Sequence, residues 1–131
     1  MAQAAKLRVG VIGAGYWAQR AHLPLFQGHA ESEVVAIASR TPEKARALAA
    51  QFGVPRVCAT VDELLALPGL DAVTIATPND SHHALALAAI GAGKHVFCEK
   101  PLAINYAQAA EMRDAARGAG VATMMCFTTR F

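Results

Sequence analysis

The sequence contains no uninterrupted apolar run of about 18 residues, the length that a helix needs to cross a membrane. It contains no basic run of five residues, and its formal net charge is only +2, so it lacks the clustered lysine and arginine of a nucleic-acid-binding protein. The first six residues lack the charged region and apolar stretch of a signal peptide. The three cysteines, Cys58, Cys98 and Cys126, lie far apart in apolar sequence, which favours reduced core thiols and a cytoplasmic protein. We therefore expect neither a membrane nor a nucleic acid as partner.

The chain has enough apolar residues for a substantial core, at 54% of 131 residues, and its length is that of one domain. Short β-type runs alternate with helical stretches, which predicts an α/β fold with a doubly wound parallel sheet and three layers, α/β/α. We expect strands at 7–12, 34–39, 57–59, 72–76, 95–98 and 121–127, and helices at about 16–27, 42–52, 60–67, 81–90 and 105–117. This content is typical of a dinucleotide-binding domain, whose strand order is 3-2-1-4-5-6.

A glycine-rich turn, Gly13-Ala14-Gly15-Tyr16-Trp17-Ala18, follows the first strand and leads into the first helix. Gly13 permits the tight turn, Gly15 lets the main chain approach a pyrophosphate, and Ala18 is small enough for the helix to pack on the sheet. The amino end of the helix would supply N–H groups and a positive dipole end to the phosphates. We therefore predict that residues 13–17 bind a dinucleotide cofactor.

The end of the second strand, Ser39-Arg40, carries no carboxylate. A site specific for NAD usually places Asp or Glu there to bind the adenine ribose, whereas an arginine accommodates the 2′-phosphate of NADP. Arg40 can also stack on the adenine ring, and Ser39 can bind a phosphate oxygen. The sequence favours NADP, with NAD left open.

Two further strand ends carry polar residues. Thr77-Pro78-Asn79 follows the fourth strand and would border the nicotinamide ribose, whereas the neighbouring His82 and His83 diverge on a helix and do not indicate a metal site. Lys100 follows the fifth strand, where its ammonium group could bind a substrate hydroxyl and stabilise the developing alkoxide. Glu99 could anchor this lysine by pairing with it, or it could hold nearby backbone groups. His22, His29 and His95 are interpreted as packing or surface residues.

Together, the glycine turn, Thr77-Pro78-Asn79 with His82, and the run Glu99-Lys100-Pro101 resemble the Gfo/Idh/MocA oxidoreductases across nearly the whole chain. The resemblance implies NAD(P)-dependent oxidation or reduction of a sugar, cyclitol or related hydroxy compound. It also implies that Lys100 is the catalytic lysine and that His82, Glu99 and Arg130 belong to the cofactor site. Ala18 in place of a third glycine is a mild departure, and the missing acid at Ser39-Arg40 puts NAD preference in doubt.

Members of that family also carry a carboxyl-terminal domain that forms the substrate pocket and usually the dimer contact. We expect residues 1–131 to be the cofactor domain alone, binding NADP but turning over little sugar. The alternative is a stand-alone nucleotide-binding module with a sensing or interaction role. In either case the apolar segment 121–127 is a candidate surface for homo-oligomer formation.

Overall fold

The structure is a computed structural model that describes residues 5–127. Its strands are β1 (Leu7–Ile12), β2 (Ser32–Ala38), β3 (Val57–Cys58), β4 (Ala72–Ile75), β5 (His95–Glu99) and β6 (Thr123–Cys126). Its helices are η1 (Ala18–His22), α1 (Leu23–Gly28), α2 (Pro42–Phe52), α3 (Val61–Leu65), η2 (Asn79–Ser81), α4 (His82–Gly91) and α5 (Tyr106–Ala119). The expected alternation of strands and helices is therefore confirmed, with boundaries that differ by a few residues.

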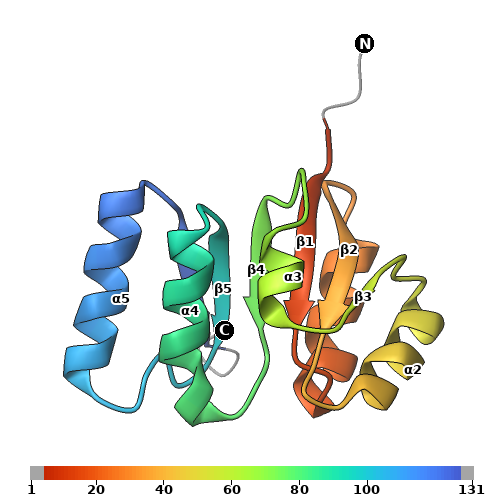
Figure 1. Ribbon diagram of the computed structural model, residues 1–131, viewed down its shortest axis with the longest axis horizontal. Helices are drawn as coiled ribbons and strands as arrows, with labels where there is room; N and C mark the ends of the chain where they lie inside the picture. The colour runs from red at the N-terminus through yellow and green to blue at the C-terminus, as the bar shows by residue number, and fades with distance from the viewer. Residues whose placement is uncertain (1–4, 128–131) are drawn as a thin grey trace.

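The six strands form one parallel sheet in the order β3-β2-β1-β4-β5-β6, as predicted. Because β1 lies between β2 and β4, the chain reverses its direction of travel across the sheet at this point. The carboxyl ends of β1, β2, β4 and β5 all lie at one edge of the sheet, at the bottom of Figure 1. In open α/β sheets this edge, beside the reversal point, is where ligands bind.

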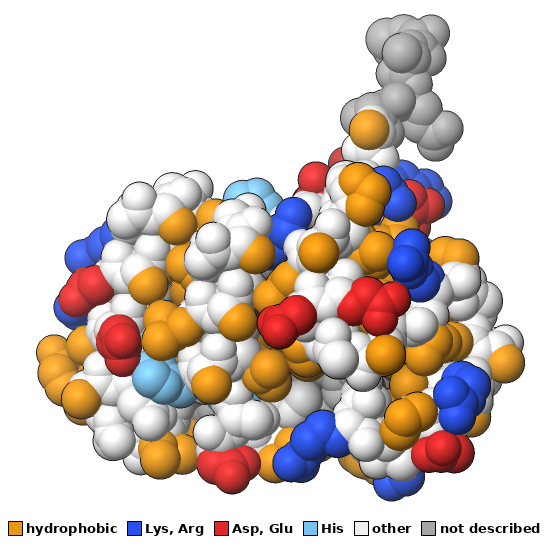
Figure 2. All heavy atoms as spheres, in the orientation of Figure 1, with side chains coloured by type: hydrophobic (Ala, Val, Ile, Leu, Met, Phe, Trp, Pro, Cys, Tyr) orange, Lys and Arg blue, Asp and Glu red, His pale blue; other side chains and the backbone are white. Residues whose placement is uncertain are grey.

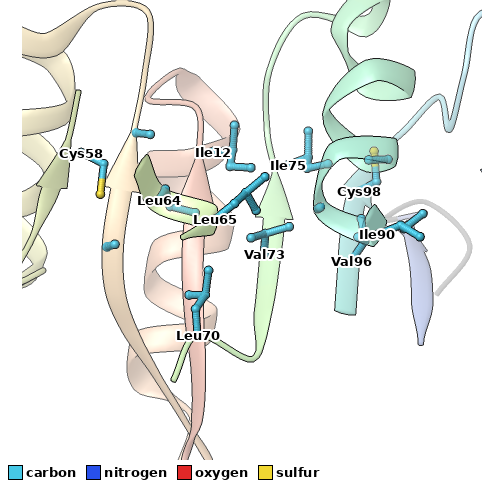
Figure 3. Packing of buried hydrophobic residues seen from close by; sticks show 14 of the residues in the cluster. Ile12, Cys58, Leu64, Leu65, Leu70, Val73, Ile75, Ile90, Val96 and Cys98 are labelled. Atoms are coloured by element: carbon cyan, nitrogen blue, oxygen red, sulfur yellow. The ribbon is translucent and has the colours of Figure 1, made fainter. Parts of the chain in front are cut away.

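Helices cover both faces of the sheet and enclose two apolar clusters, which gives the predicted three layers. One cluster packs α3, α4 and α5 on the sheet and includes Leu64, Val73 and Met112. Figure 3 shows Ile12, Leu64, Leu65 and Val73 gathered around α3 in this cluster. The other packs α1 and α2 on the opposite face around Val11, Ile37 and Leu48. The central strands are buried on both faces, which explains their nearly continuous apolar sequence.

The first helix differs from the expected regular α-helix. It begins at Tyr16, continues as the five-residue π-helix η1, and returns to α-helical geometry in α1. Pro24 explains the change, because it has no N–H to donate to the carbonyl four residues earlier. In a π-helix each N–H donates to the carbonyl five residues earlier, and here the Leu23 N–H donates to the Ala18 carbonyl.

Thr60 caps α3 through its side chain, whereas Thr41 stands at the N-cap position of α2 without a side-chain cap. The Thr60 hydroxyl accepts the Glu63 N–H at 3.0 Å, and the Glu63 carboxylate accepts the N–H of Ala59, the residue before the cap, at 2.9 Å, an arrangement close to a capping box. Thr41 makes no side-chain cap, and its own N–H donates instead to the Ser39 hydroxyl at 3.1 Å. The Thr41 side chain is therefore available to the neighbouring cavity.

None of the helices within residues 5–127 combines the length and apolar character needed to cross a membrane. On the face shown in Figure 2, acidic and basic side chains are interspersed over the surface. The three cysteines are free thiols, with Cys58 and Cys98 buried and Cys126 half-buried.

Candidate cofactor site

A cavity of about 720 Å³ lies at the carboxyl edge of the sheet. It is lined by the glycine turn after β1, the end of β2, the turn after β4 and the residues Glu99 and Lys100 at the end of β5. Four segments that are distant in sequence thus meet at one place. The lining contains Arg40, Lys44 and Lys100, and among the described lining residues Glu99 is the single carboxylate. This balance of charge favours an anionic ligand.

The glycine turn is held tightly on one side and open on the other. Gly13 has a φ of +114°, and a Cβ built there would lie 2.1 Å from the Ala76 carbonyl oxygen. Its N–H donates to the Ala38 carbonyl at 2.8 Å, which fixes the turn between β2 and β4. A Cβ built at Gly15 would meet nothing within 4 Å, so an open space adjoins the main chain there. The space beside Gly15 fits the close approach of a pyrophosphate.

Tyr16 and Trp17 follow the glycines and line the same cavity. Their rings lie edge to face with centroids 5.2 Å apart, and both are exposed, at 65% and 43%. Trp17 is the single tryptophan of the chain, so its fluorescence reports directly on occupancy of this cavity. Ala18, by contrast, is fully buried against the sheet, as its small size predicted.

The end of β2 presents two cations and two hydroxyl groups to the cavity. Ser39 and Arg40, predicted from the sequence, are joined there by Thr41 and by Lys44 from the first turn of α2. Lys44 was missed in the sequence because it lies on a helix that was interpreted only as packing. Its position three residues after Thr41 could have revealed it, since that spacing returns a side chain to the amino end of a helix.

The turn after β4 is built by hydrogen bonds within itself. The Ser81 hydroxyl lies 2.6 Å from both the Thr77 hydroxyl and the Pro78 carbonyl. Thr77, Pro78 and Asn79 line the cavity, together with Ser81.

His82 lies beneath this turn rather than in the cavity lining. It is fully buried, and its Nδ1 and Nε2 atoms lie 2.7 Å and 3.0 Å from the carbonyl oxygens of Pro101 and Thr77. The ring donates to one of these carbonyls when neutral and to both when protonated. His82 therefore links the turns that follow β4 and β5, and the structure gives it no surface toward a ligand.

Lys100 is exposed and lines the cavity, whereas Glu99 is buried beneath it. Of the two roles expected for Glu99, the structure shows the contact with a nearby backbone group, and the interactions of the described residues include no pairing with the Lys100 ammonium. Its Oε2 accepts the Lys100 main-chain N–H at 3.1 Å, and its Oε1 lies 2.9 Å from His22 Nε2. His22, interpreted from the sequence as a packing or surface residue, is buried and hydrogen-bonded from both ring nitrogens.

Burial and the nearby Glu99 carboxylate raise the pKa values of two thiols. Burial, the Glu99 carboxylate and a hydrogen bond to that carboxylate raise the pKa of Cys126 to about 11. Burial and the same carboxylate raise the pKa of Cys98 to about 12. His22, Glu99 and Cys126 also offer metal-ligand atoms within 4.8 Å of one another. The thiol is protonated at neutral pH and the imidazole already bonds the carboxylate, so this trio is better explained as a hydrogen-bond network.

Most site residues predicted from the sequence thus meet in one cavity. Arg130 lies outside the described residues. The lining residues that the sequence did not indicate are mainly those that close the cavity between α2, α3 and α4: Thr41, Lys44, Ala59, Thr60, Val61, Ser81 and Leu85.

A doubly wound parallel sheet with this glycine turn, cationic β2 end and strand-end lysine defines a dinucleotide-binding domain of the oxidoreductase class. Comparison with known proteins identifies the family. The profile of the oxidoreductase family with an NAD-binding Rossmann fold, Gfo/Idh/MocA, matches residues 7–127, and the chain belongs to this family.

Similar proteins include enzymes named for sugar substrates. The chain is 47% identical over 89 residues to 1,5-anhydro-D-fructose reductase of Ensifer adhaerens, covering 68% of the chain and 27% of the relative. It is 37% identical to D-glucoside 3-dehydrogenase of Escherichia coli, covering 95% of the chain and 36% of the relative.

A solved structure gives the same fold. A 3-ketoreductase from Actinomadura kijaniata in complex with NADP and TDP-benzene is 37% identical and superposes with a TM-score of 0.88. The match covers 93% of this chain and 37% of the ketoreductase. Across these three proteins the chain therefore spans between 27% and 37% of the relative's length.

Proposed function

We propose that the chain binds NADP in the cavity at the carboxyl edge of the sheet and contributes Lys100 to hydride transfer with a sugar-like hydroxy compound. The observation that carries this proposal is the convergence of the glycine turn, the cationic end of β2 and Lys100 on one cavity. When bound, the cofactor supplies or accepts the hydride at its nicotinamide ring. The chain's own residues bind its phosphates and place a cation beside the reacting oxygen.

The preference for NADP rests on the end of β2. A 2′-phosphate is dianionic at neutral pH, and Arg40 can meet it with a two-pronged set of N–H donors while Lys44 adds a second positive charge. Ser39 and Thr41 add hydroxyl groups that can donate to its oxygens. The ribose hydroxyl of NAD would meet no carboxylate among the described residues at the end of β2. These residues therefore offer no acceptor that would stabilise bound NAD in preference to NADP.

Lys100 would act on the substrate oxygen. Its ammonium group donates a hydrogen bond to a substrate hydroxyl and stabilises the negative charge that develops as a hydride leaves the adjacent carbon. In the reverse direction it polarises a carbonyl that accepts the hydride. The enclosing surface for a sugar and a second proton-handling group would come from the part of the relatives that this chain does not span.

Titration of the purified chain with NADP and NAD, followed by Trp17 fluorescence, tests the cofactor assignment. We expect NADP to bind at least tenfold more tightly than NAD. Arg40→Ala should weaken NADP binding by about 10- to 100-fold, the usual effect of losing a charge-assisted hydrogen bond, with little effect on NAD. Arg46→Ala is the matched control, because Arg46 lies on α2, the helix that follows Arg40, but pairs with Glu43 at the surface. Tighter binding of NAD, or equal losses in both variants, would contradict the proposal.

Turnover is tested separately. We expect negligible polyol-dependent reduction of NADP by residues 1–131, whereas Lys100→Ala in a longer protein that contains this segment should abolish turnover and leave cofactor affinity within about threefold. An unchanged rate in that variant would remove Lys100 from the mechanism. NADP binding without turnover in any longer protein would favour a sensing module.

A further inference from the structure

Beneath Lys100, three buried polar side chains from three different elements form a continuous chain. Thr74 lies in the middle of β4, His22 ends η1, and Glu99 ends β5. Their exposed fractions are 0%, 1% and 5%. Thr74 Oγ1 hydrogen-bonds His22 Nδ1, His22 Nε2 bonds Glu99 Oε1, and Glu99 Oε2 accepts the Lys100 N–H. The chain therefore runs from the core of the sheet to the main chain of the proposed catalytic lysine.

The directions of these hydrogen bonds follow from the chemistry of the partners. When Glu99 is ionised its carboxylate can only accept, and His22 Nε2–H is then the donor of the hydrogen bond between them. Nδ1 then accepts from the Thr74 hydroxyl, or donates to it when the ring is protonated. Every polar side-chain atom of this hydrogen-bond chain has a partner in both cases, and no described buried side-chain polar atom in the protein lacks one.

Burying polar side chains costs free energy unless each one is hydrogen-bonded, so a chance placement of these three groups in the core would be unfavourable. A carboxylate at the end of a sheet strand would be better solvated in water, and an apolar residue would pack there without any hydrogen-bond requirement. What the carboxylate does at this position is hold the first N–H beyond the sheet, because β5 ends at Glu99. Its Oε1 is held in turn by His22, which fixes the orientation of the carboxyl plane.

The other side of Lys100 is held as well. The carbonyl oxygen of the next residue, Pro101, lies 2.7 Å from Nδ1 of buried His82, which can donate a hydrogen bond to it. The main chain around Lys100 is thus fixed on both sides while its side chain remains exposed in the cavity. This places the constraint on the Lys100 main chain, from which the direction of the side chain follows.

We propose that Thr74, His22 and Glu99 are positioning residues that orient Lys100 toward the cofactor cavity. His22 is the central member, because its two ring nitrogens bond Thr74 in the sheet core and the Glu99 carboxylate. The proposal rests on the proposed function for the role of Lys100, but the hydrogen-bond chain itself can be tested without any cofactor. It predicts that removing the hydrogen bond from His22 to Glu99 increases the mobility of the Lys100 main chain while the phosphate-binding turn stays intact.

The sharpest test compares two amides at position 22. The His22→Gln side chain carries its amide nitrogen near the place of Nε2 and can still donate to Glu99. The His22→Asn side chain is shorter and reaches only toward Thr74. The two variants are matched in chemistry and differ in which hydrogen bond they preserve. Hydrogen exchange of the Lys100 N–H should accelerate about tenfold in His22→Asn, the effect of losing one net hydrogen bond, and remain near wild type in His22→Gln.

The Val96 N–H, at the other end of β5, serves as the internal control because it bonds the Ala122 carbonyl at 3.0 Å, far from this network. Its exchange should stay unchanged in both variants. Equal exchange of the Lys100 N–H in wild type and in folded His22→Asn would overturn the proposal, as would equal acceleration in the two variants. If neither variant folds, Thr74→Val decides: it removes only a hydroxyl from β4, and unchanged Lys100 exchange would again overturn the proposal.

A second readout separates positioning from mere stability. With saturating NADP, acylation of the Lys100 amine should be slowed at least tenfold in wild type and in His22→Gln, but less than twofold in His22→Asn. NADP affinity should stay within about threefold in all three proteins, because Gly15 and Arg40 are untouched. Parallel losses of affinity and protection would indicate a general structural defect and contradict the assignment. Failure of the wild type to bind NADP would refute the proposed function. The hydrogen-exchange experiment needs no cofactor, so it would still test the hydrogen-bond chain in that case.

Discussion

Gly13→Ala provides the most demanding test of the site geometry. The added Cβ would lie 2.1 Å from the Ala76 carbonyl oxygen and 2.8 Å from its carbon, both main-chain atoms that cannot rotate away. The residue would also have to hold a φ of +114°, a conformation that costs about 1–3 kcal/mol for a residue with a side chain. Adding the displacement of β1 from β4, we expect a loss of about 3–5 kcal/mol in the free energy of unfolding, within the range of severe core substitutions.

Urea unfolding of the purified chain, followed by far-ultraviolet circular dichroism, measures this loss. A typical domain has only about 5–15 kcal/mol of stability, so the midpoint should shift strongly. Gly15→Ala is the control, because its Cβ would meet nothing within 4 Å. We expect its stability to change by less than about 0.5 kcal/mol, while NADP binding weakens at least tenfold because the methyl group occupies the pyrophosphate space. A stable Gly13→Ala protein, or a destabilised Gly15→Ala protein, would refute this account of the turn.

Three further outcomes follow from the described structure. Thr60→Ala removes the α3 cap and should cost about 1 kcal/mol in thermal or urea unfolding, whereas an unchanged midpoint would show that the capping box contributes nothing. The raised pKa values of Cys98 and Cys126 mean that the unfolded chain loses thiol protons first as pH rises, so stability should fall between about pH 9 and about pH 12. Replacing both cysteines with alanine should flatten that part of the pH profile. Met124, which is 59% exposed on edge strand β6, should promote self-association that Met124→Lys reduces; a strictly monomeric sedimentation profile for the wild type would contradict this prediction.

The sequence was sufficient to predict the fold because its local signals agree with one another. The strands are short and nearly continuously apolar, and strong caps such as Asn105 at the start of α5 mark the helices between them. In a parallel sheet the connections then restrict the topology to a few arrangements, of which the observed order is the common one. The π-helix η1 was not foreseen, because Pro24 is compatible either with the end of one helix and the start of another or with a change of hydrogen-bond register.

The candidate site was predictable where a residue's role depends on its own strand end. The glycine turn, Ser39, Arg40 and Lys100 each follow a strand directly, so their placement at the carboxyl edge follows from the parallel topology. Lys44 was missed because its place in the cavity depends on how α2 approaches the sheet. That approach is determined by packing in the cluster around Leu48, which no local pattern in the sequence describes.

The buried histidines show most clearly what sequence reasoning lacks. His22 and His82 lie in apolar helical sequence, and such a position is occupied equally well by a core residue or by a surface residue. Only the tertiary structure reveals that His22 meets a carboxylate 77 positions away and that His82 meets a carbonyl 19 positions away. Both contacts converge on Glu99-Lys100-Pro101, the segment that the sequence singled out for chemistry. The lysine could be recognised from its neighbours in sequence, but the groups that hold it in place are neighbours only in the folded protein.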